Sequence, residues 1–115
     1  AALASNAPPP LPRTIMADVL LSLTLPSDVT QLVEDFLLSR PDLVPGFTTS
    51  QANGHGAVIP LVAPSELVSG HAPRTHIRMV GNEDDMRHIL KLIKSELPNA
   101  NVFFWLIPVI EMGRL

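Results

Sequence analysis

Apolar residues recur at every second position near the start of the chain, in residues 17–26. The alternating residues are Val19, Leu21, Leu23 and Leu25. A period of two is typical of a strand that buries one face, and a proline at the end of such a run interrupts it. Leu20 adds apolar surface to the opposite face. The segment therefore predicts a strand that ends at Pro26.

The next apolar residues lie three and four positions apart, between residues 27 and 40. They are Val29, Leu32, Val33, Phe36 and Leu37. This spacing predicts a helix with one buried stripe. The side-chain oxygen of Ser27 is expected to cap the first turn, where Asp28 favours the positive end of the helix dipole. Pro41 ends the helix, because the residue before a proline avoids the helical region.

Alternation returns on both sides of a long central loop. Residues 47–53 are polar at alternate positions and predict a half-exposed strand. Residues 54–73 contain prolines and glycines without a clear period, and they predict a loop. Residues 74–80 alternate again and predict a third strand, which Gly81 ends. Loops of this length in a small domain are commonly functional or disordered.

A second helix and a last strand complete the pattern. Asn82 offers a capping side chain, and three acidic residues follow it in the first turn of the helix. The buried stripe of this helix is expected to contain Met86, Ile89, Leu90, Ile93 and Leu97. Residues 102–110 are almost all apolar, whereas a strand that covers a core on one face should alternate. The last strand therefore has two apolar faces.

The order strand, helix, strand, strand, helix, strand predicts a ferredoxin-like βαββαβ fold of the α+β class. In this fold a four-stranded antiparallel sheet has two helices on one face, and the last strand lies at an edge beside the first. Pro108 agrees with an edge position, because proline cannot donate to a strand ladder. The domain is expected at residues 16–115.

The last strand also predicts association between copies of the chain. Its two faces are expected to hold Phe103, Trp105 and Ile107 on one side and Phe104, Leu106 and Ile110 on the other. Helices on one face of the sheet leave the second apolar face uncovered, and such a face on an edge strand associates with other chains. We expect a homo-oligomer that buries this face. The alternative is that the central loop folds back over it.

Composition excludes several function classes. The net charge is −3 and the eight Lys and Arg residues are scattered, so we expect no nucleic-acid binding. The chain has no cysteine, which excludes disulfides and zinc–sulfur sites. No apolar run approaches the ~20 residues of a membrane span, so we expect no insertion into a membrane. Residues 1–15 contain four prolines and a single charge, and we expect a disordered leader or tag-like tail there.

Three stretches of the sequence resemble the PII-like and CutA-like superfamily of ferredoxin-like homotrimers. QLVEDFLLSRPDLVPGFTT (31–49) resembles the first helix and the turn after it. GHGAVIPLVAPSELVSGHAPRTHIRMVGNEDD (54–85) resembles the loop-bearing hairpin and the start of the second helix, and FFWLIPVIEMGRL (103–115) resembles the closing strand. Together these stretches are most similar to a small family of uncharacterised bacterial PII-like proteins that are encoded near heavy-metal efflux systems.

The resemblance implies a cytoplasmic homotrimer whose three sheets face a central axis. It also implies clefts between subunits, where signalling members bind small effectors, and a long loop that contacts a partner protein. Nucleotide-binding members have a Gly-rich, basic loop before the second helix. The corresponding segment here, MVGNEDDMRH (79–88), is short and acidic and would repel phosphates. No tyrosine matches the one that is uridylylated in some PII loops, because the chain has none.

Basic residues of the third strand are candidates for binding an anionic effector. Arg74, His76 and Arg78 alternate along the polar side of this strand. Arginine makes forked hydrogen bonds to carboxylates and phosphates, so the ligand would be a nucleotide phosphate, bicarbonate or a carboxylate. Arg114 lies where the resemblance implies a phosphate-binding basic residue. The alternative is a solvated strand face, or salt bridges within the protein or to a neighbouring subunit.

A second candidate site binds a divalent metal ion. Its proposed ligands are His55, Glu66, His71 and His76, because imidazole and carboxylate groups suit divalent first-row metals. Two of the histidines flank the central loop, so the hairpin can bring its ends together. The spacing matches no recognised zinc signature. The alternative is that these are exposed histidines with no shared role.

The central loop is the candidate surface for a partner protein. The residues assigned to this role are Asn53, Gly54, His55, Gly56 and Glu66. Glycines permit positive φ angles and close backbone approach, and long loops on rigid scaffolds commonly bind partners. The alternative is an ordinary turn.

The leading hypothesis is a PII-like signalling protein that binds a small effector between subunits and contacts a partner, a metal-efflux transporter, through its loop. One alternative is a direct metal-binding protein of the CutA-like metal-tolerance type. Another is a structural, self-assembling protein. Divalent metals and adenine nucleotides are the ligands to consider. We expect no enzyme, because the chain lacks a G-x-S-x-G motif, a P-loop and a recognisable catalytic triad.

Overall fold

The computed structural model describes residues 19–56 and 72–115. Its elements are, in chain order, the strand β1 (Val19–Pro26), the 3-10 turn η1 (Ser27–Val29), the helix α2 (Thr30–Leu38), the strands β2 (Thr48–Gly54) and β3 (Ala72–Gly81), the helix α4 (Glu83–Glu96) and the strand β4 (Phe103–Pro108). The expected leader at residues 1–15 lies outside the described residues, as do the loop residues Glu66 and His71.

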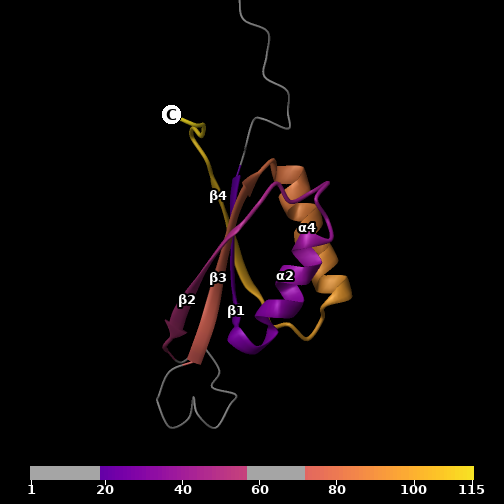
Figure 1. Cartoon of the computed structure of the whole chain (residues 1–115), viewed down its shortest axis with the longest axis vertical. Coiled ribbons are helices and arrows are strands. Elements are labelled where there is room, and N and C mark those ends of the chain that lie inside the picture. Colours follow the sequence, from indigo (N-terminus) through magenta and orange to yellow (C-terminus); the bar gives the residue numbers. More distant parts are fainter. Residues whose placement is uncertain (1–18, 57–71) are drawn as a thin grey trace, which may run out of the picture.

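The strands form one antiparallel sheet in the order β2-β3-β1-β4. Both helices lie on the same face of this sheet (Figure 1). β4 is an edge strand beside β1, as Pro108 indicated, and β2 is the opposite edge. The predicted ferredoxin-like βαββαβ fold is therefore confirmed.

Strand register decides which residues face the helices. Leu23 of β1 lies opposite Ile77 of β3 and Phe104 of β4, and this row faces the helices. The adjacent row, Ser22 with Arg78 and Trp105, points to the other side. We call that side, which no described helix covers, the open face of the sheet. Alternation along β1 thus separates the core from a second surface, as its period of two predicted.

The core lies between the sheet and the two helices. Its most deeply buried apolar side chains are Leu21, Leu23, Leu25, Val33, Leu37, Ile77, Met86 and Ile89. The stripe predicted for α4 is confirmed, because Met86, Ile89 and Ile93 are buried there. Gly81 permits this packing, since a Cβ atom at that position would lie 2.8 Å from Met86 Cε. Burial of this single apolar layer is the main force that stabilises the domain.

The start of α4 follows the prediction, whereas the start of α2 does not. Asn82 Oδ1 accepts a hydrogen bond from the Asp85 amide at 2.9 Å, as expected for a capping residue. Ser27 does not cap α2, which begins three residues later, at Thr30. The chain leaves β1 through η1 instead, and the Ser27 carbonyl accepts from the Thr30 amide. The Ser27 hydroxyl is buried without a hydrogen-bond partner among the described residues.

The buried stripe of α2 is narrower than its spacing predicts. Val33 and Leu37 are buried, and Val29 and Phe36 are partly buried against the core. Leu32, which we expected in the stripe, is 53% exposed. The helix has only nine residues. Its contact with the sheet is therefore confined to one line of side chains, and Leu32 lies beside that line.

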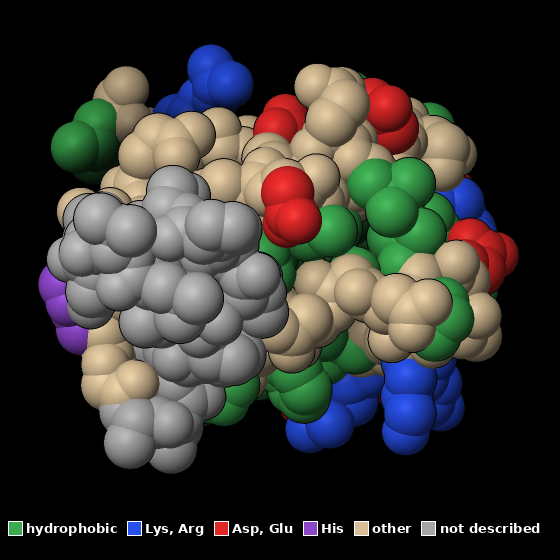
Figure 2. Space-filling view, turned by 90° about the horizontal axis from the view of Figure 1, so that it is seen from below, with side chains coloured by type: hydrophobic (Ala, Val, Ile, Leu, Met, Phe, Trp, Pro, Cys, Tyr) green, Lys and Arg blue, Asp and Glu red, His purple; other side chains and the backbone are tan. Residues whose placement is uncertain are grey.

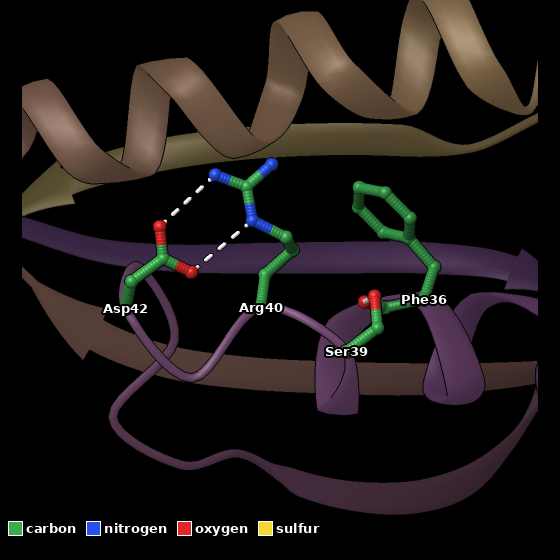
Figure 3. Close-up of polar contacts among 4 residues, drawn as sticks. All are labelled: Phe36, Ser39, Arg40 and Asp42. Carbon is green, nitrogen blue, oxygen red and sulfur yellow. Dashed lines mark hydrogen bonds and ion pairs between the residues drawn. The ribbon is translucent and has the colours of Figure 1, made fainter.

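A surface ion pair orders the chain after α2. The Arg40 guanidinium donates to both Asp42 carboxylate oxygens, at 3.1 and 3.0 Å, and the Ser39 hydroxyl donates to the Phe36 carbonyl at 2.6 Å (Figure 3). The hydrogen bonds from Arg40 lower the pKa of Asp42 from its ordinary value. Both groups are solvent-accessible, so this pair shapes the turn more than it stabilises the fold.

Candidate functional site

Aromatic side chains of β4 lie uncovered on the open face. Phe103 is 68% exposed, and Trp105 and Ile107 are also exposed. The Phe103 and Trp105 rings pack edge to face, with their centroids 6.0 Å apart. These residues share one side of β4, as the alternation predicted, because they lie opposite the outward residues of β1.

A cavity of about 580 Å³ lies on the open face, at the end of the sheet where β2 leads into the central loop. We call it the open-face cavity. Its lining comes from all four strands and the turn before β4: Thr24, Ala52, Asn53, Gly54, His55, Arg74, His76, Asn101, Phe103 and Trp105. The volume falls within the range of about 300–1,000 Å³ that is usual for small-molecule sites. One wall is aromatic and the other contains basic and polar groups.

Arg74 and His76 are the basic groups of this cavity. Arg74 is only 5% exposed, and its Nη1 donates to the Pro73 carbonyl at 2.9 Å. His76 Nδ1 lies 2.9 Å from the hydroxyl oxygen of Thr24, its cross-strand neighbour. A guanidinium has five N–H donors, so it can bond to a protein carbonyl and to an anion at the same time. Arg74 can therefore present positive charge and N–H groups to a small anion, and His76 adds an imidazole ring to the same wall.

The structure separates the other two anion candidates from this pair. Arg78 points to the open face but does not line the cavity, and it is exposed. Arg114 lies in the exposed segment after β4. That segment leaves the sheet at the end opposite to the β2–β3 hairpin (Figure 1). Within one chain, the predicted set of four therefore divides into a pair in the cavity and two residues outside it.

The metal candidates are only partly brought together. His55 and His76 line the same cavity, whereas Glu66 and His71 lie outside the described residues. Among residues 19–56 and 72–115, no three His, Cys, Asp or Glu side chains are grouped closely enough to hold a metal ion. Two imidazoles at one cavity can supply part of a coordination sphere, which is usually completed by two further ligands.

The start of the central loop contributes to the cavity wall. Asn53, Gly54 and His55 line it, and Gly56 follows with a φ of +116°. Residues with a side chain rarely adopt that backbone conformation, so glycine suits this position. The first residues of the loop that was assigned to partner binding therefore form part of the cavity wall. A ligand there would contact the base of the loop.

Five residues of the cavity, among them Ala52, were not assigned to a site from the sequence. Phe103 and Trp105 were expected to serve in packing, and Thr24 and Asn101 had no assigned role. Asn101 has a φ of +55°, a left-handed conformation that asparagine adopts more readily than most residues. The alternation of β1 already placed Thr24 on the open side. No sequence signal indicated that its hydroxyl would meet His76.

The connection from β3 to α4 is short and acidic, as the sequence suggested. Asn82 alone separates the two elements, and the first turn of α4 contains Glu83, Asp84 and Asp85. The carboxylates favour the positive end of the helix dipole. They leave no basic loop at this point to bind a phosphate chain.

Sequence comparison identifies one family. A family model described as "Protein of unknown function (DUF3240)" matches residues 15–115. A comparison with curated proteins gives no significant match. No helix of the described segments is long and apolar enough to cross a membrane.

Several solved structures share the fold. A DUF3240 family protein from Shewanella baltica is 15% identical, with 88% of this chain and 99% of that chain aligned at a TM-score of 0.68. CutA1 from Pyrococcus horikoshii is 12% identical, with 83% and 86% aligned and a TM-score of 0.62. CPII from Thiomonas intermedia, a nitrogen regulatory PII-like protein bound to ADP, AMP and bicarbonate, is 20% identical, with 87% and 97% aligned and a TM-score of 0.56. At these identities the likeness concerns the fold alone, and it confirms the PII-like and CutA-like architecture.

Proposed function

We propose that this chain, which belongs to the DUF3240 family, is a PII-like regulatory protein. It forms a homotrimer, binds a small anionic effector in the open-face cavity and signals to a partner protein through the loop after β2. The observation on which the proposal rests is the position of Arg74, a nearly buried guanidinium in a cavity at the base of that loop. The proposed role is binding and relay, without catalysis.

The uncovered aromatic side chains of β4 support the proposed assembly. A monomer would leave Phe103, Trp105 and Ile107 in water, although apolar patches on edge strands promote association. Three copies with their open faces toward a common axis would bury these residues. The open-face cavity would then lie at the boundary between subunits, where a ligand can report on the assembly. The PII-like fold makes this arrangement the first to test.

The effector class follows from the charges around the cavity. One buried arginine and one histidine suit a compact anion such as bicarbonate or a carboxylate. The acidic turn between β3 and α4 disfavours a long phosphate chain, so adenine nucleotides are weaker candidates. The PII-like protein from Thiomonas intermedia was solved with bicarbonate as well as with ADP and AMP. The proposed partner, on the family resemblance, is a metal-efflux transporter.

Titration calorimetry of the full chain with bicarbonate, acetate, AMP and ADP tests the proposal. We expect Arg74→Gln to weaken anion binding about ten- to hundredfold, because a hydrogen bond to a charged group contributes ~1.5–3 kcal/mol. Arg87→Gln is the matched control, since Arg87 is an exposed residue of α4 that pairs with Glu83 at 2.7 Å. If none of the anions binds, or if the Arg74→Gln variant binds them as tightly as the native chain, the open-face cavity is not the site of an anionic effector.

Direct metal binding is the second candidate, because His55 and His76 line the same cavity. If it is correct, zinc, copper or cobalt binds the full chain and both His55→Ala and His76→Ala lose affinity. His88→Ala should have no effect, since His88 lies exposed on α4, outside the cavity. Affinity no tighter than high micromolar for all three metals would end this candidate.

A further inference from the structure

A second cavity, of about 530 Å³, lies on the helix side of the sheet, between α4 and β4. We call it the α4–β4 groove. Its apolar lining consists of Leu90, Ile93, Leu97, Pro98, Val102 and Phe104. Phe104 is 49% exposed here, although it points to the same side of the sheet as the core. The groove is therefore an apolar surface that α4 borders but does not cover.

Two lysines border the groove. Lys91 and Lys94 both line it and are exposed, and no acidic side chain belongs to the lining. Arg87, one turn earlier on α4, is paired with Glu83, whereas neither lysine forms an ion pair among the described residues. Figure 2 shows this end of the molecule, with Lys and Arg side chains along the lower border, beside hydrophobic ones. The groove thus suits an apolar segment with a negative charge.

The segment after β4 has these properties. Residues 109–115 extend beyond the sheet, with Ile110 fully exposed and Met112 54% exposed. Glu111 lies between them. In an extended segment Ile110 and Met112 point to one side and Glu111 to the other. Two apolar side chains can then enter the groove while the carboxylate stays at its rim, near the lysines.

We infer that the α4–β4 groove binds residues 109–115 of a second copy of the chain. Ile110 and Met112 pack on Phe104 and the apolar face of α4, and Glu111 pairs with Lys91 or Lys94. The positive charge of Arg114 lies beyond Gly113, where the segment leaves the groove. The outer edge of β4 has backbone groups that no described strand pairs, so an extended segment can also add to the sheet.

The chain's own segment cannot fill its groove. Phe104, on which the two apolar side chains are proposed to pack, lies about 13 Å from Pro108 along β4, since each strand residue advances about 3.3 Å. Ile110 is two residues beyond Pro108 and reaches about 7 Å at most, so it cannot return to Phe104, and Met112 reaches about 14 Å only if no residue is used in a turn. The segment also leaves β4 in the opposite direction (Figure 1), so a reversal would use part of that reach. A neighbouring copy is free of this restriction.

The test uses the full chain with Ile110→Ser and Met112→Ser, which empties the groove in any assembly. A labelled peptide of residues 109–115 should bind this variant in fluorescence anisotropy. Adding Lys91→Glu and Lys94→Glu to this variant should weaken peptide binding about tenfold. A peptide with Glu111→Lys should bind the doubly charge-reversed protein as tightly as the native peptide binds the protein with both lysines. A peptide of residues 1–15 should not bind. The inference would be overturned if the lysine substitutions left the affinity of the 109–115 peptide unchanged, or if only the 1–15 peptide bound.

The inference rests on the proposed function only for the presence of a second copy, so light scattering distinguishes the two failures. If the native chain is a trimer and the peptide does not bind, residues 109–115 do not bind the groove of a second copy, and the effector proposal stands. If the native chain is a monomer at all concentrations, the proposed assembly is wrong, and so is the binding of residues 109–115 by a second copy. On dilution, the trimer of the Ile110→Ser, Met112→Ser variant should dissociate at a higher protein concentration than the native trimer. This result supports the binding of residues 109–115 by a neighbouring copy.

Discussion

The connections between elements depend on a few polar side chains. Thr30 donates to Thr75 at 2.7 Å and joins the start of α2 to β3, while Asn82 closes the first turn of α4. Arg40 and Asp42 fix the turn after α2. Each of these contacts can be removed by a single substitution, so its contribution can be measured.

Asn82→Ala is expected to lower the free energy of unfolding by about 1 kcal/mol, because it removes the oxygen that accepts from the Asp85 amide. Urea denaturation measures the change. Asn82→Ser keeps a capping oxygen and should recover most of the loss. Equal losses in both variants would mean that the side chain acts through packing rather than as a cap.

The Arg40–Asp42 pair predicts a small dependence of stability on pH. The pKa of Asp42 is lowered in the folded chain, so its contribution is fully present above the ordinary aspartate pKa and is lost as the pH falls through the lowered value. Asp42→Asn should therefore be slightly less stable than the native chain at neutral pH and equal to it in strong acid. A difference that persists in strong acid would contradict this assignment.

At the scale of elements, α2 depends on a single line of buried side chains. Leu37 is fully buried and its neighbour Leu38 is 67% exposed. Leu37→Ala should cost roughly 2–5 kcal/mol of unfolding free energy, because it leaves a cavity in the core. Leu38→Ala should stay within about 0.5 kcal/mol, as surface substitutions usually do. Similar losses at the two positions, measured by chemical denaturation, would mean that α2 packs differently.

β4 differs from the other strands because both of its faces are apolar. One face completes the core and borders the α4–β4 groove, and the other forms part of the open face. β4 is also an edge strand. An exposed edge strand with this composition favours association, and the two proposed contacts would cover it on each side.

At the scale of the whole molecule, the only tryptophan of the chain reports on assembly. Trp105 lies on the open face and is expected to become buried in the trimer. Its fluorescence should shift to longer wavelength when the protein is diluted below its association range, and Ile107→Lys should cause the same shift at high concentration. Leu38→Lys, on the helix side, is the control and should leave the emission unchanged. A constant emission over all concentrations, with a monomeric mass, would contradict the proposed assembly.

The sequence by itself determined the elements, their order and the fold class. The periods of two and of 3.6 along the chain follow from backbone geometry, so Leu21, Leu23 and Leu25 and the stripe of α4 could be assigned without coordinates. Local rules gave the cap at Asn82, where a helix follows directly. The same rule failed at Ser27, because the exit from β1 through a 3-10 turn depends on how α2 meets β3.

The tertiary structure alone decided which residues meet. Strand register placed Thr24 beside His76, 52 positions away in the sequence, and brought Arg74, His55 and Trp105 to the same cavity. It also left Arg78 outside that cavity and Arg114 at the opposite end of the sheet. The physical reason is that alternation fixes the face on which a side chain lies, whereas long-range pairing of strands fixes its neighbours.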